Sequence, residues 1–473
     1  MNPDQTGTNI HVTLPDAFQR LRRGVAIARM PGAASRRDRL AKLETLLREH
    51  GTALAAAISA DFSHRSSHET QLLELFPSLS AIRHARAHVR GWMRAKKSWA
   101  SRWFLPARIE LRPQPLGVVG IIVPWNYPLL LAVAPMAAAL AAGNRVMVKM
   151  SEFTPATGTL FADLIAKYFP DDEVVVVNGA ADVAREFSAL PFDHLLFTGS
   201  TVVGKLVMQA AAPHLTPVTL ELGGKSPAII GADADINEAA AKIMFGKCLN
   251  AGQTCVAPDY VLLPRGAEGA FIDAARAVVA QHYPTLAANP DYTAIASPRH
   301  VARLQGLLED ATANGAVVTT LADDAMADSQ KIAPTIVTHT HDHMRLMQEE
   351  IFGPILPLVG YDSLDDAIEY VNNRPCPLAL YYFGHHRAHI DQVLDQTTAG
   401  GVSVNETLMH LSQEDLPFGG VGASGMGAYH GKFGFDTFSK LKPIFHQSRF
   451  NGLFLFKPPY GRRFAAMIQL LMK

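Results

Sequence analysis

The sequence predicts an α/β protein built on two doubly wound parallel sheets. From residue 116 onward, short runs of strand type alternate with helical segments, which is the pattern of strand–helix–strand units. These runs are almost continuously apolar, as expected of strands that helices cover on both faces. The chain has 473 residues, 48% of them hydrophobic, so it is long enough for roughly two or three domains.

Composition and charge narrow the possible partners and location. Lys and Arg number 43, and Asp and Glu also number 43, so the formal net charge of +0 gives no electrostatic reason to expect nucleic acid as a partner. Three cysteines are too few for a disulfide framework, which favours a reducing compartment. The start of the chain has no apolar stretch typical of a signal peptide, so we expect a cytoplasmic protein.

The first half of the chain reads as helices followed by strand–helix units. Residues 15–95 have helical periodicity, and the strand-type runs LGVVGIIV, RVMVK, EVVVV, HLLF and TPVTLEL follow. Residues 113–144 carry no charge and are long enough to span a bilayer, but Pro124, Pro128 and Pro135 interrupt them. A buried strand, a polar turn and a buried helix therefore explain this stretch better than a membrane span.

A second series of strands begins after the Gly223-Gly224 pair, where we place a boundary. Its runs are SPAIIG, YVLL, AVVTTL, PILPLVGY, LALYYFG and GGVSVN. The end of the chain differs in character, because residues 449–473 combine aromatic and aliphatic side chains with five basic residues and no acidic one. Such a basic amphipathic tail suits either a membrane interface or a helix packed on the protein itself.

Several short polar motifs directly follow strands of the first series, at the edge where open α/β sheets bind ligands. Gly199 and Gly204 of FTGSTVVG flank the start of a helix, whose unpaired amides attract phosphate. Lys149 and Glu152 of KMSE offer a cation and a carboxylate to sugar hydroxyls. An ordinary strand-to-helix turn explains the first motif equally well, and a helix cap explains the second.

Cys255, in the stretch NAGQTCVAPD, is either a catalytic thiol or a small buried residue. A catalytic cysteine needs a base and a donor for the developing oxyanion. Asn126 offers side-chain N–H groups, and Glu221 is a carboxylate at the end of an otherwise apolar strand. Burying such a carboxylate is costly unless it is paired or functional, and an ion-paired group at the sheet edge is the alternative.

The motifs PWNYP, FTGST, LELGGKSP, GQTC, EEIFGP and LPFGG occur in the order and at the spacing found in aldehyde dehydrogenases, which the chain resembles over about residues 15–450. The phrases NAGQTCVAPDY and MQEEIFGP are similar to the class 3 branch of that superfamily. DFSHRSSHET, KMSEFTP and KPPYGRRF are most similar to the bacterial coniferyl aldehyde dehydrogenase group. The resemblance implies two parallel-sheet domains, one for the cofactor and one catalytic, with a small β oligomerisation arm.

The resemblance also implies a role for each motif residue. Cys255 would be the nucleophile, Glu221 the general base, and Asn126 with the backbone N–H of Cys255 the oxyanion hole. The implied NAD(P)-binding residues are Trp125, Lys149, Glu152, Gly199, Ser200, Gly204, Leu222, Glu350 and Phe352. Of these, Lys149 and Glu152 would take the adenosine ribose, Gly199 to Gly204 the pyrophosphate, and Glu350 with Phe352 the nicotinamide ribose. The implied substrate-binding residues are Tyr127, Thr254, Val256 and Phe418.

The implied reaction is NAD(P)-dependent oxidation of an aldehyde to the carboxylic acid, through a thiohemiacetal and a thioester on cysteine. NAD is the expected cofactor, with some use of NADP. Coniferyl aldehyde or another aromatic aldehyde is the expected substrate. The alternative is a medium- or long-chain fatty aldehyde dehydrogenase that could associate with a membrane.

The resemblance divides the chain as follows: residues 1–96 and 114–222 form the NAD(P)-binding domain, 223–430 the catalytic domain, 97–113 and 431–448 the arm, and 449–473 the tail. A homodimer is expected, and we favour a tail that packs over the substrate entrance rather than one that touches a membrane. Cys248 and Cys376 are expected to be structural. No metal site is expected, because the histidines of HTHDH and HHRAH fall in polar stretches between elements.

Overall fold

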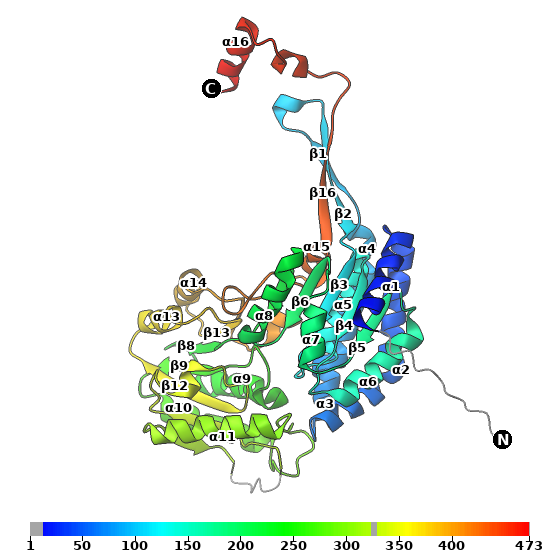
Figure 1. Ribbon diagram of the computed structural model, residues 1–473. Coiled ribbons are helices and arrows are strands. Elements are labelled where there is room, and N and C mark those ends of the chain that lie inside the picture. Colours follow the sequence, from blue (N-terminus) through cyan, green and yellow to red (C-terminus); the bar gives the residue numbers. More distant parts are fainter. Residues whose placement is uncertain (1–12, 323–328, 473) are drawn as a thin grey trace, which may run out of the picture.

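The structure, a computed structural model, describes residues 13–322 and 329–472. Two lobes, each built on a mainly parallel sheet, lie side by side, and a long three-stranded arm projects from one of them (Figure 1). The predicted fold class is therefore confirmed. The described part of residues 15–95 is helical, as the sequence predicts: α1 (Leu14–Ile27), α2 (Ala33–Asp61), α3 (Ser67–Thr70), a π-helical turn η1 (Gln71–Leu75) and α4 (Phe76–Trp92).

The first lobe contains a six-stranded sheet in the order β15-β7-β6-β3-β4-β5. Its strands are β3 (Val118–Ile122), β4 (Arg145–Lys149), β5 (Val174–Val177), β6 (His194–Thr198), β7 (Val218–Glu221) and β15 (Gly425–Met426). The connecting helices are α5 (Leu130–Ala142), α6 (Pro155–Tyr168), α7 (Ala181–Ser188), α8 (Thr201–Ala211) and the 3-10 turn η3 (Ala212–His214). Every residue of β3, β4 and β6 is buried, which explains their continuous apolar sequences.

The uncharged stretch forms β3, a turn and the buried helix α5, as predicted. Among the described residues, no helix is both long enough and apolar enough to cross a membrane.

The second lobe contains a seven-stranded sheet in the order β10-β11-β12-β9-β8-β13-β14. Its strands are β8 (Pro227–Ile230), β9 (Tyr260–Pro264), β10 (Val317–Thr320), β11 (Thr335–Thr338), β12 (Ile355–Tyr361), β13 (Ala379–Phe383) and β14 (Gly401–Val404). The helices and turns are α9 (Ile236–Cys248), η4 (Leu249–Gly252), α10 (Glu268–His282), α11 (Pro298–Ala313), α12 (Arg345–Gln348), α13 (Leu364–Asn372), α14 (Arg387–Gln396) and η5 (Met409–Ser412). All its pairings are parallel except that of β10 with β11.

The arm is an antiparallel sheet in the order β1-β2-β16. It comprises β1 (Lys96–Trp99), the short turn η2 (Arg102–Phe104), β2 (Arg108–Pro115) and β16 (Ser439–His446). β16 pairs with β2 along its whole length, from Ser439 opposite Pro115 to His446 opposite Arg108.

Two segments lie elsewhere than the expected domain ranges place them. β15, expected in the catalytic domain, pairs antiparallel with β7 of the first sheet, Gly425 opposite Glu221. A side chain at Gly425 would lie 2.0 Å from the carbonyl oxygen of Leu220, so a glycine permits this pairing. Residues expected at the start of the second arm segment instead form α15 (Gly431–Thr437), which packs on α5 through Gly434 and the buried Phe435.

The tail also departs from expectation. Its elements, η6 (Leu453–Phe456) and α16 (Arg462–Leu471), lie beyond the far end of the arm (Figure 1). The expectation that the tail covers the substrate entrance is therefore wrong for the tail of the same chain. The cause is β16, whose eight residues carry the chain about 26 Å along the arm, at roughly 3.3 Å per residue, before the tail begins.

Candidate active site

The loop that carries Cys255 follows α9 and η4 and is held by a fully buried side chain. The Gln253 amide donates to the carbonyls of Asn250 (2.9 Å) and Ala294 (3.0 Å), and its Oε1 accepts from the N–H of Ala296 (2.9 Å). All the polar atoms of this side chain are thus engaged by backbone, which fixes the loop. Cys255, two residues on, is half-buried.

Asn126 lies in the turn between β3 and α5 and is 3% exposed. Its Nδ2 donates to the carbonyl oxygen of Gln253 at 3.1 Å, which joins this turn to the Cys255 loop. An amide nitrogen carries two protons, so one N–H remains for an oxygen that arrives at the site. This is the donor that an oxyanion needs.

Glu221 is the last residue of β7 and is 2% exposed. Neither of its carboxylate oxygens has a hydrogen-bond partner among the described residues. Burial raises the pKa of Glu221 well above its ordinary value. The ion pair that offered an alternative explanation is not found in the described part of the chain, so this is a buried carboxyl free to exchange a proton.

The Cys255 thiol lies within electrostatic reach of two carboxyls. Burial, then Glu350 and Glu221, raise the pKa of Cys255 to about 12. The thiol is therefore protonated at neutral pH in this state of the protein, and forming the thiolate requires a base or a nearby positive charge.

Glu350 lies between the two lobes, against the Gly223-Gly224 turn. A Cβ on Gly223 would lie 2.1 Å from Oε2 of Glu350, so the glycine makes room for this carboxyl. Burial, and then the nearby Asp259, raise the pKa of Glu350 to about 8, although the N–H of Gly224 donates to it. Two carboxyls with raised pKa values thus flank one thiol.

Several aromatic rings pack together beside these groups. Phe352 meets the indole of Trp125 edge-on, with ring centroids 5.4 Å apart. The other contacts of Trp125 are His300 at 4.7 Å and Phe62 at 6.0 Å. His300 was not found from the sequence, because nothing near it marks it as part of a site.

The ends of β4 and β6 carry the residues expected to bind the cofactor. Lys149, almost wholly buried at the end of β4, pairs with the half-exposed Glu152 at 3.1 Å. Ser200 caps α8 by accepting the N–H of Val203 at 3.4 Å. Glu152, a carboxylate suited to hydroxyls, thus lies in the turn after β4, and the N-terminus of α8, suited to phosphate, follows β6. Only β3 separates these two strands in the sheet, and this arrangement fits a dinucleotide.

Close packing against neighbouring side chains is a second reason for glycine at positions 199 and 204. A Cβ on Gly199 would lie 2.5 Å from the ring of Phe197, and one on Gly204 would lie 2.8 Å from the Leu222 side chain. Val202, on the first turn of α8, is 72% exposed. It adds an apolar surface beside the position expected to bind phosphate, and the sequence motifs did not reveal this surface.

The residues expected to bind the substrate differ in their surroundings. The hydroxyls of Tyr127 and Thr254 are hydrogen-bonded at 2.5 Å, and the Phe418 ring stacks on His430 with centroids 5.3 Å apart. Val256 is 1% exposed and belongs to the main core. Tyr127, Thr254 and Phe418 are buried as well, so the expected contact of Val256 with the substrate stays a prediction.

The structure also describes the cysteines and the side chains of metal-ligand type. The three cysteines, all within the described residues, are free. Cys248 is 2% exposed, and burial raises its pKa to about 12. Within residues 13–322 and 329–472, no group of three or more His, Cys, Asp or Glu side chains is arranged to hold a metal ion.

Comparison with known proteins decides the family. The model of the aldehyde dehydrogenase family matches residues 15–444. The chain belongs to this family. As an aldehyde dehydrogenase it oxidises aldehydes to carboxylic acids with a nicotinamide cofactor, NAD with NADP possible, as the sequence motifs imply.

Individual relatives of this aldehyde dehydrogenase agree with the family. A probable coniferyl aldehyde dehydrogenase of Pseudomonas aeruginosa is 52% identical over 454 residues, 96% of this chain and 95% of the relative. The substrate-bound structure of Staphylococcus aureus AldH is 36% identical, with a TM-score of 0.92 over 98% of this chain and 100% of the other. The NAD+ complex of a Bacillus cereus aldehyde dehydrogenase is 28% identical, with a TM-score of 0.82 over 92% and 89%.

Proposed function

We propose that this aldehyde dehydrogenase oxidises coniferyl aldehyde or a similar aromatic aldehyde, with Cys255 as nucleophile and Glu221 as general base. The observation that supports these roles best is the buried, unpaired carboxyl of Glu221, close enough to Cys255 to raise the pKa of its thiol. The name of the 52% identical relative supports the substrate.

The first half of the reaction forms an acyl-enzyme. The Cys255 thiol loses its proton to water, and the resulting thiolate adds to the aldehyde carbon. The second N–H of Asn126 with the backbone N–H of Cys255 stabilises the oxyanion, an effect worth about 3 kcal/mol per donor. NAD(P), when bound, would supply the acceptor for the hydride of this carbon. Lys149, Glu152 and the first turn of α8 would hold it, with Glu350 and Phe352 at the nicotinamide ribose. The product on Cys255 is a thioester.

The second half releases the acid. The ionised form of Glu221 takes a proton from water as the water attacks the thioester, Cys255 departs as the thiolate, and Glu221 then returns the proton to solvent. A pKa raised by burial suits this role, because a carboxyl with an ordinary pKa near 4.3 would be a weak base at neutral pH. The carboxylic acid then leaves the site.

The experiment that tests the substrate is a steady-state comparison of coniferyl aldehyde, benzaldehyde and decanal, each with NAD and with NADP. The proposal predicts that kcat/KM for the aromatic aldehydes exceeds that for decanal by about tenfold or more. A preference for decanal would instead identify a fatty aldehyde dehydrogenase.

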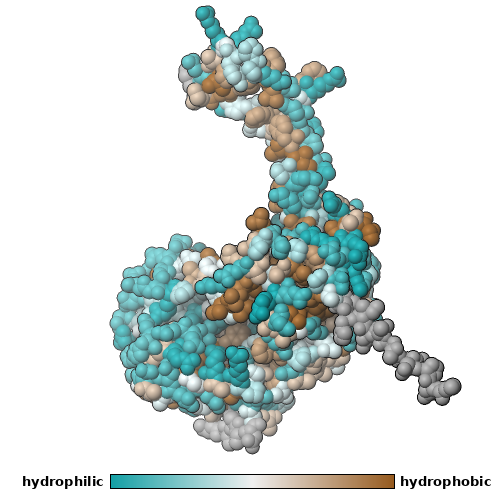
Figure 2. Space-filling model, in the orientation of Figure 1, coloured by the Kyte–Doolittle hydropathy of each residue, from teal (hydrophilic) through white to brown (hydrophobic). Residues whose placement is uncertain are grey.

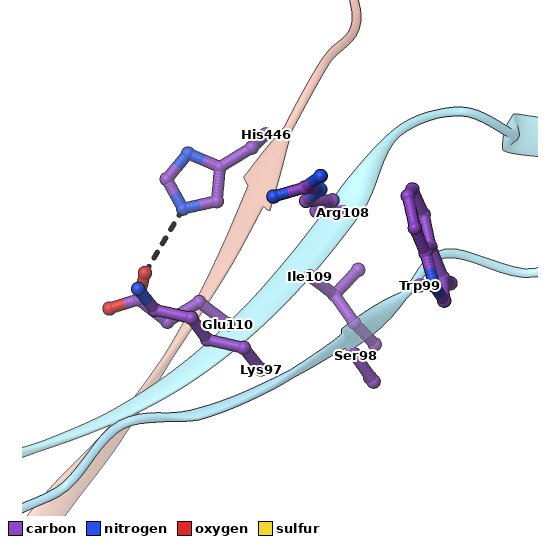
Figure 3. Close-up of a pocket in the computed structure, with 7 residues that line it drawn as sticks. All are labelled: Lys97, Ser98, Trp99, Arg108, Ile109, Glu110 and His446. Carbon is purple, nitrogen blue, oxygen red and sulfur yellow. Dashed lines mark hydrogen bonds and ion pairs between the residues drawn. The ribbon is translucent and has the colours of Figure 1, made fainter.

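We also propose that the arm joins two copies of the chain into a homodimer. The arm exposes Trp99 (59%), Trp103 (50%) and Phe445 (49%), and Figure 2 shows apolar surface along it and at its tip. A hollow of about 630 Å³ lies on its face, lined by the side chains drawn in Figure 3, where His446 meets Glu110 at 3.2 Å. This hollow lies on the arm, not beside Cys255, so it suits a protein contact rather than the reaction.

Light scattering on the intact enzyme should report a dimer, and Trp99→Glu should weaken it because a charge would enter the contact. We expect no binding to anionic vesicles, and salt-sensitive co-sedimentation would assign the tail to a membrane instead. The three free cysteines agree with a reducing compartment, and we place the enzyme in the cytoplasm.

A further inference from the structure

A short segment between α2 and α4, from Arg65 to Glu74, contacts both the turn that carries Asn126 and the loop that carries Cys255. Arg65 is 1% exposed and Glu74 is fully buried, and Nη1 of Arg65 donates to Oε1 of Glu74 at 2.6 Å. A fully buried ion pair seldom adds stability, because removing two charges from water costs about as much as their attraction returns. Such a pair is better explained by a role in holding the residues around it in one conformation.

Arg65 contacts the turn that carries Asn126. The same Nη1 donates to the backbone carbonyl oxygen of Asn126 at 3.1 Å. The guanidinium also lies over the ring of the next residue, Tyr127, 4.9 Å from its centroid. One buried cation thus holds the backbone of the residue that we assign to the oxyanion hole and the side chain of its neighbour.

Glu74 holds the other end of the same turn. Its Oε2 accepts the N–H groups of Leu129 (2.7 Å) and Leu130 (3.1 Å), where α5 begins. A carboxylate is stabilised at a helix N-terminus by these unpaired donors and by the helix dipole. The Arg65–Glu74 pair therefore holds the turn at Asn126 and again where the turn joins α5.

Glu69 connects the same segment to the Cys255 loop. Its carboxylate accepts the backbone N–H of Asn250 at 3.1 Å and the hydroxyl of Thr293 at 2.5 Å. The side-chain amide of Asn250 then donates to the carbonyl oxygen of Asn126 at 3.2 Å. Glu69 and Glu74 are five residues apart, and the π-helical turn η1 brings such positions toward one side, as in π-bulges at functional sites.

We propose that Arg65, Glu69 and Glu74 are positioning residues that hold Asn126 in register with Cys255 for the stabilisation of the oxyanion. They touch neither substrate nor cofactor and act through Asn126 and Asn250. This inference rests on the roles proposed above for Asn126 and Cys255.

The principal test is the double variant Arg65→Met/Glu74→Gln. The two members of the pair become neutral together, so neither is left as a lone buried charge, and the amide oxygen of the introduced glutamine can still accept from the start of α5. We expect the rate constant of the pre-steady-state NADH burst with benzaldehyde to fall about 10- to 100-fold, because a small misplacement of a catalytic donor has an effect of that size. KM for NAD and the melting temperature should change little.

Two further variants separate positioning from a general loss of structure. Arg65→Lys keeps a charged donor and should recover part of the burst rate. Glu173→Gln disrupts another partly buried contact, with Arg39 at 2.7 Å, at the N-terminal end of β5 and so at the strand ends away from the site, and should leave the burst rate unchanged. An equal loss in Glu173→Gln and in Arg65→Met/Glu74→Gln would overturn the inference.

A comparison with Asn126→Ala distinguishes failure of this inference from failure of the proposed function. If Asn126→Ala alone does not slow the burst, the oxyanion assignment is wrong. If it slows the burst and the Arg65→Met/Glu74→Gln variant does not, the positioning role is wrong. If both roles hold, combining all three substitutions should be little slower than Asn126→Ala alone, because the effects pass through one residue.

Discussion

Replacing Glu221 by Gln should stabilise the protein while it slows steady-state turnover. The folded protein keeps a buried, unpaired carboxyl whose pKa is raised by burial, whereas in the unfolded chain this group ionises near pH 4.3. Above that pH the folded state binds more protons than the unfolded state, so the stability contributed by this group falls as the pH rises. Glu221→Gln removes this dependence.

The size of the effect follows from two constants. Each pH unit above about 4.3 lowers the free energy of unfolding of the wild type by up to about 1.4 kcal/mol, for as long as the folded carboxyl stays protonated. With an unfolding entropy of about 2.1 cal/mol/K per residue, the 473 residues give about 1 kcal/mol/K. The melting temperature of Glu221→Gln should therefore rise above that of the wild type by about 1 °C for each pH unit, beginning from near equality at pH 4.5.

Scanning calorimetry without cofactor, from pH 4.5 to pH 8, measures this difference. Steady-state turnover should fall about 10²- to 10⁴-fold, the usual contribution of a general base, while a burst of NADH near one per site remains. As a control, Glu173→Gln removes a carboxylate that accepts from Arg39, so its melting temperature should fall. If the melting temperatures of wild type and Glu221→Gln changed in parallel with pH, the Glu221 carboxyl would be ionised or paired after folding, and the reasoning would be refuted.

Three further predictions concern the thiol, the oxyanion donor and the cofactor. Because the pKa of Cys255 is about 12, its alkylation by iodoacetamide without cofactor should accelerate about tenfold per pH unit from pH 7 to 9. Glu350→Gln should speed the alkylation, because Glu350 contributes to the raised pKa. An alkylation rate independent of pH would contradict this prediction. Asn126→Ala should lower kcat/KM about 10²- to 10³-fold through loss of one donor, and an unchanged value would remove Asn126 from the oxyanion hole. Glu152→Gln should narrow the preference for NAD by improving the use of NADP, as measured by the ratio of kcat/KM values; an unchanged ratio would mean that Glu152 does not contact the ribose.

Much of this architecture could be predicted from the sequence because its signals are local. The apolar runs of β3, β4 and β6 identify strands covered on both faces. Pro124 and Pro128 predict the turn before α5, whereas Pro135 lies inside that helix. Cys255, Glu221 and Asn126 lie in short motifs at strand ends or turns, and topology brings such positions together. The sequence could not show that Glu221 is unpaired, because that depends on every neighbour in the fold.

What the sequence did not reveal depends on contacts between distant segments. Arg65 reaches a carbonyl 61 residues away, and nothing in its own helical surroundings indicates burial. β15 has two residues, too few for a strand signal, and pairs with β7 through backbone alone. Val256 follows the nucleophile directly, yet its side chain turns into the core.

The central claim is that the aldehyde carbon becomes a thioester on Cys255, and trapping that thioester tests it most directly. Glu221→Gln would be mixed with NAD and coniferyl aldehyde, quenched with acid after the burst, and analysed by intact and peptide mass spectrometry. We expect one acyl group per chain, carried by the peptide that contains Cys255, and none in Cys255→Ala. An unmodified protein after a full burst, or an acyl group on Cys248 or Cys376, would contradict the mechanism.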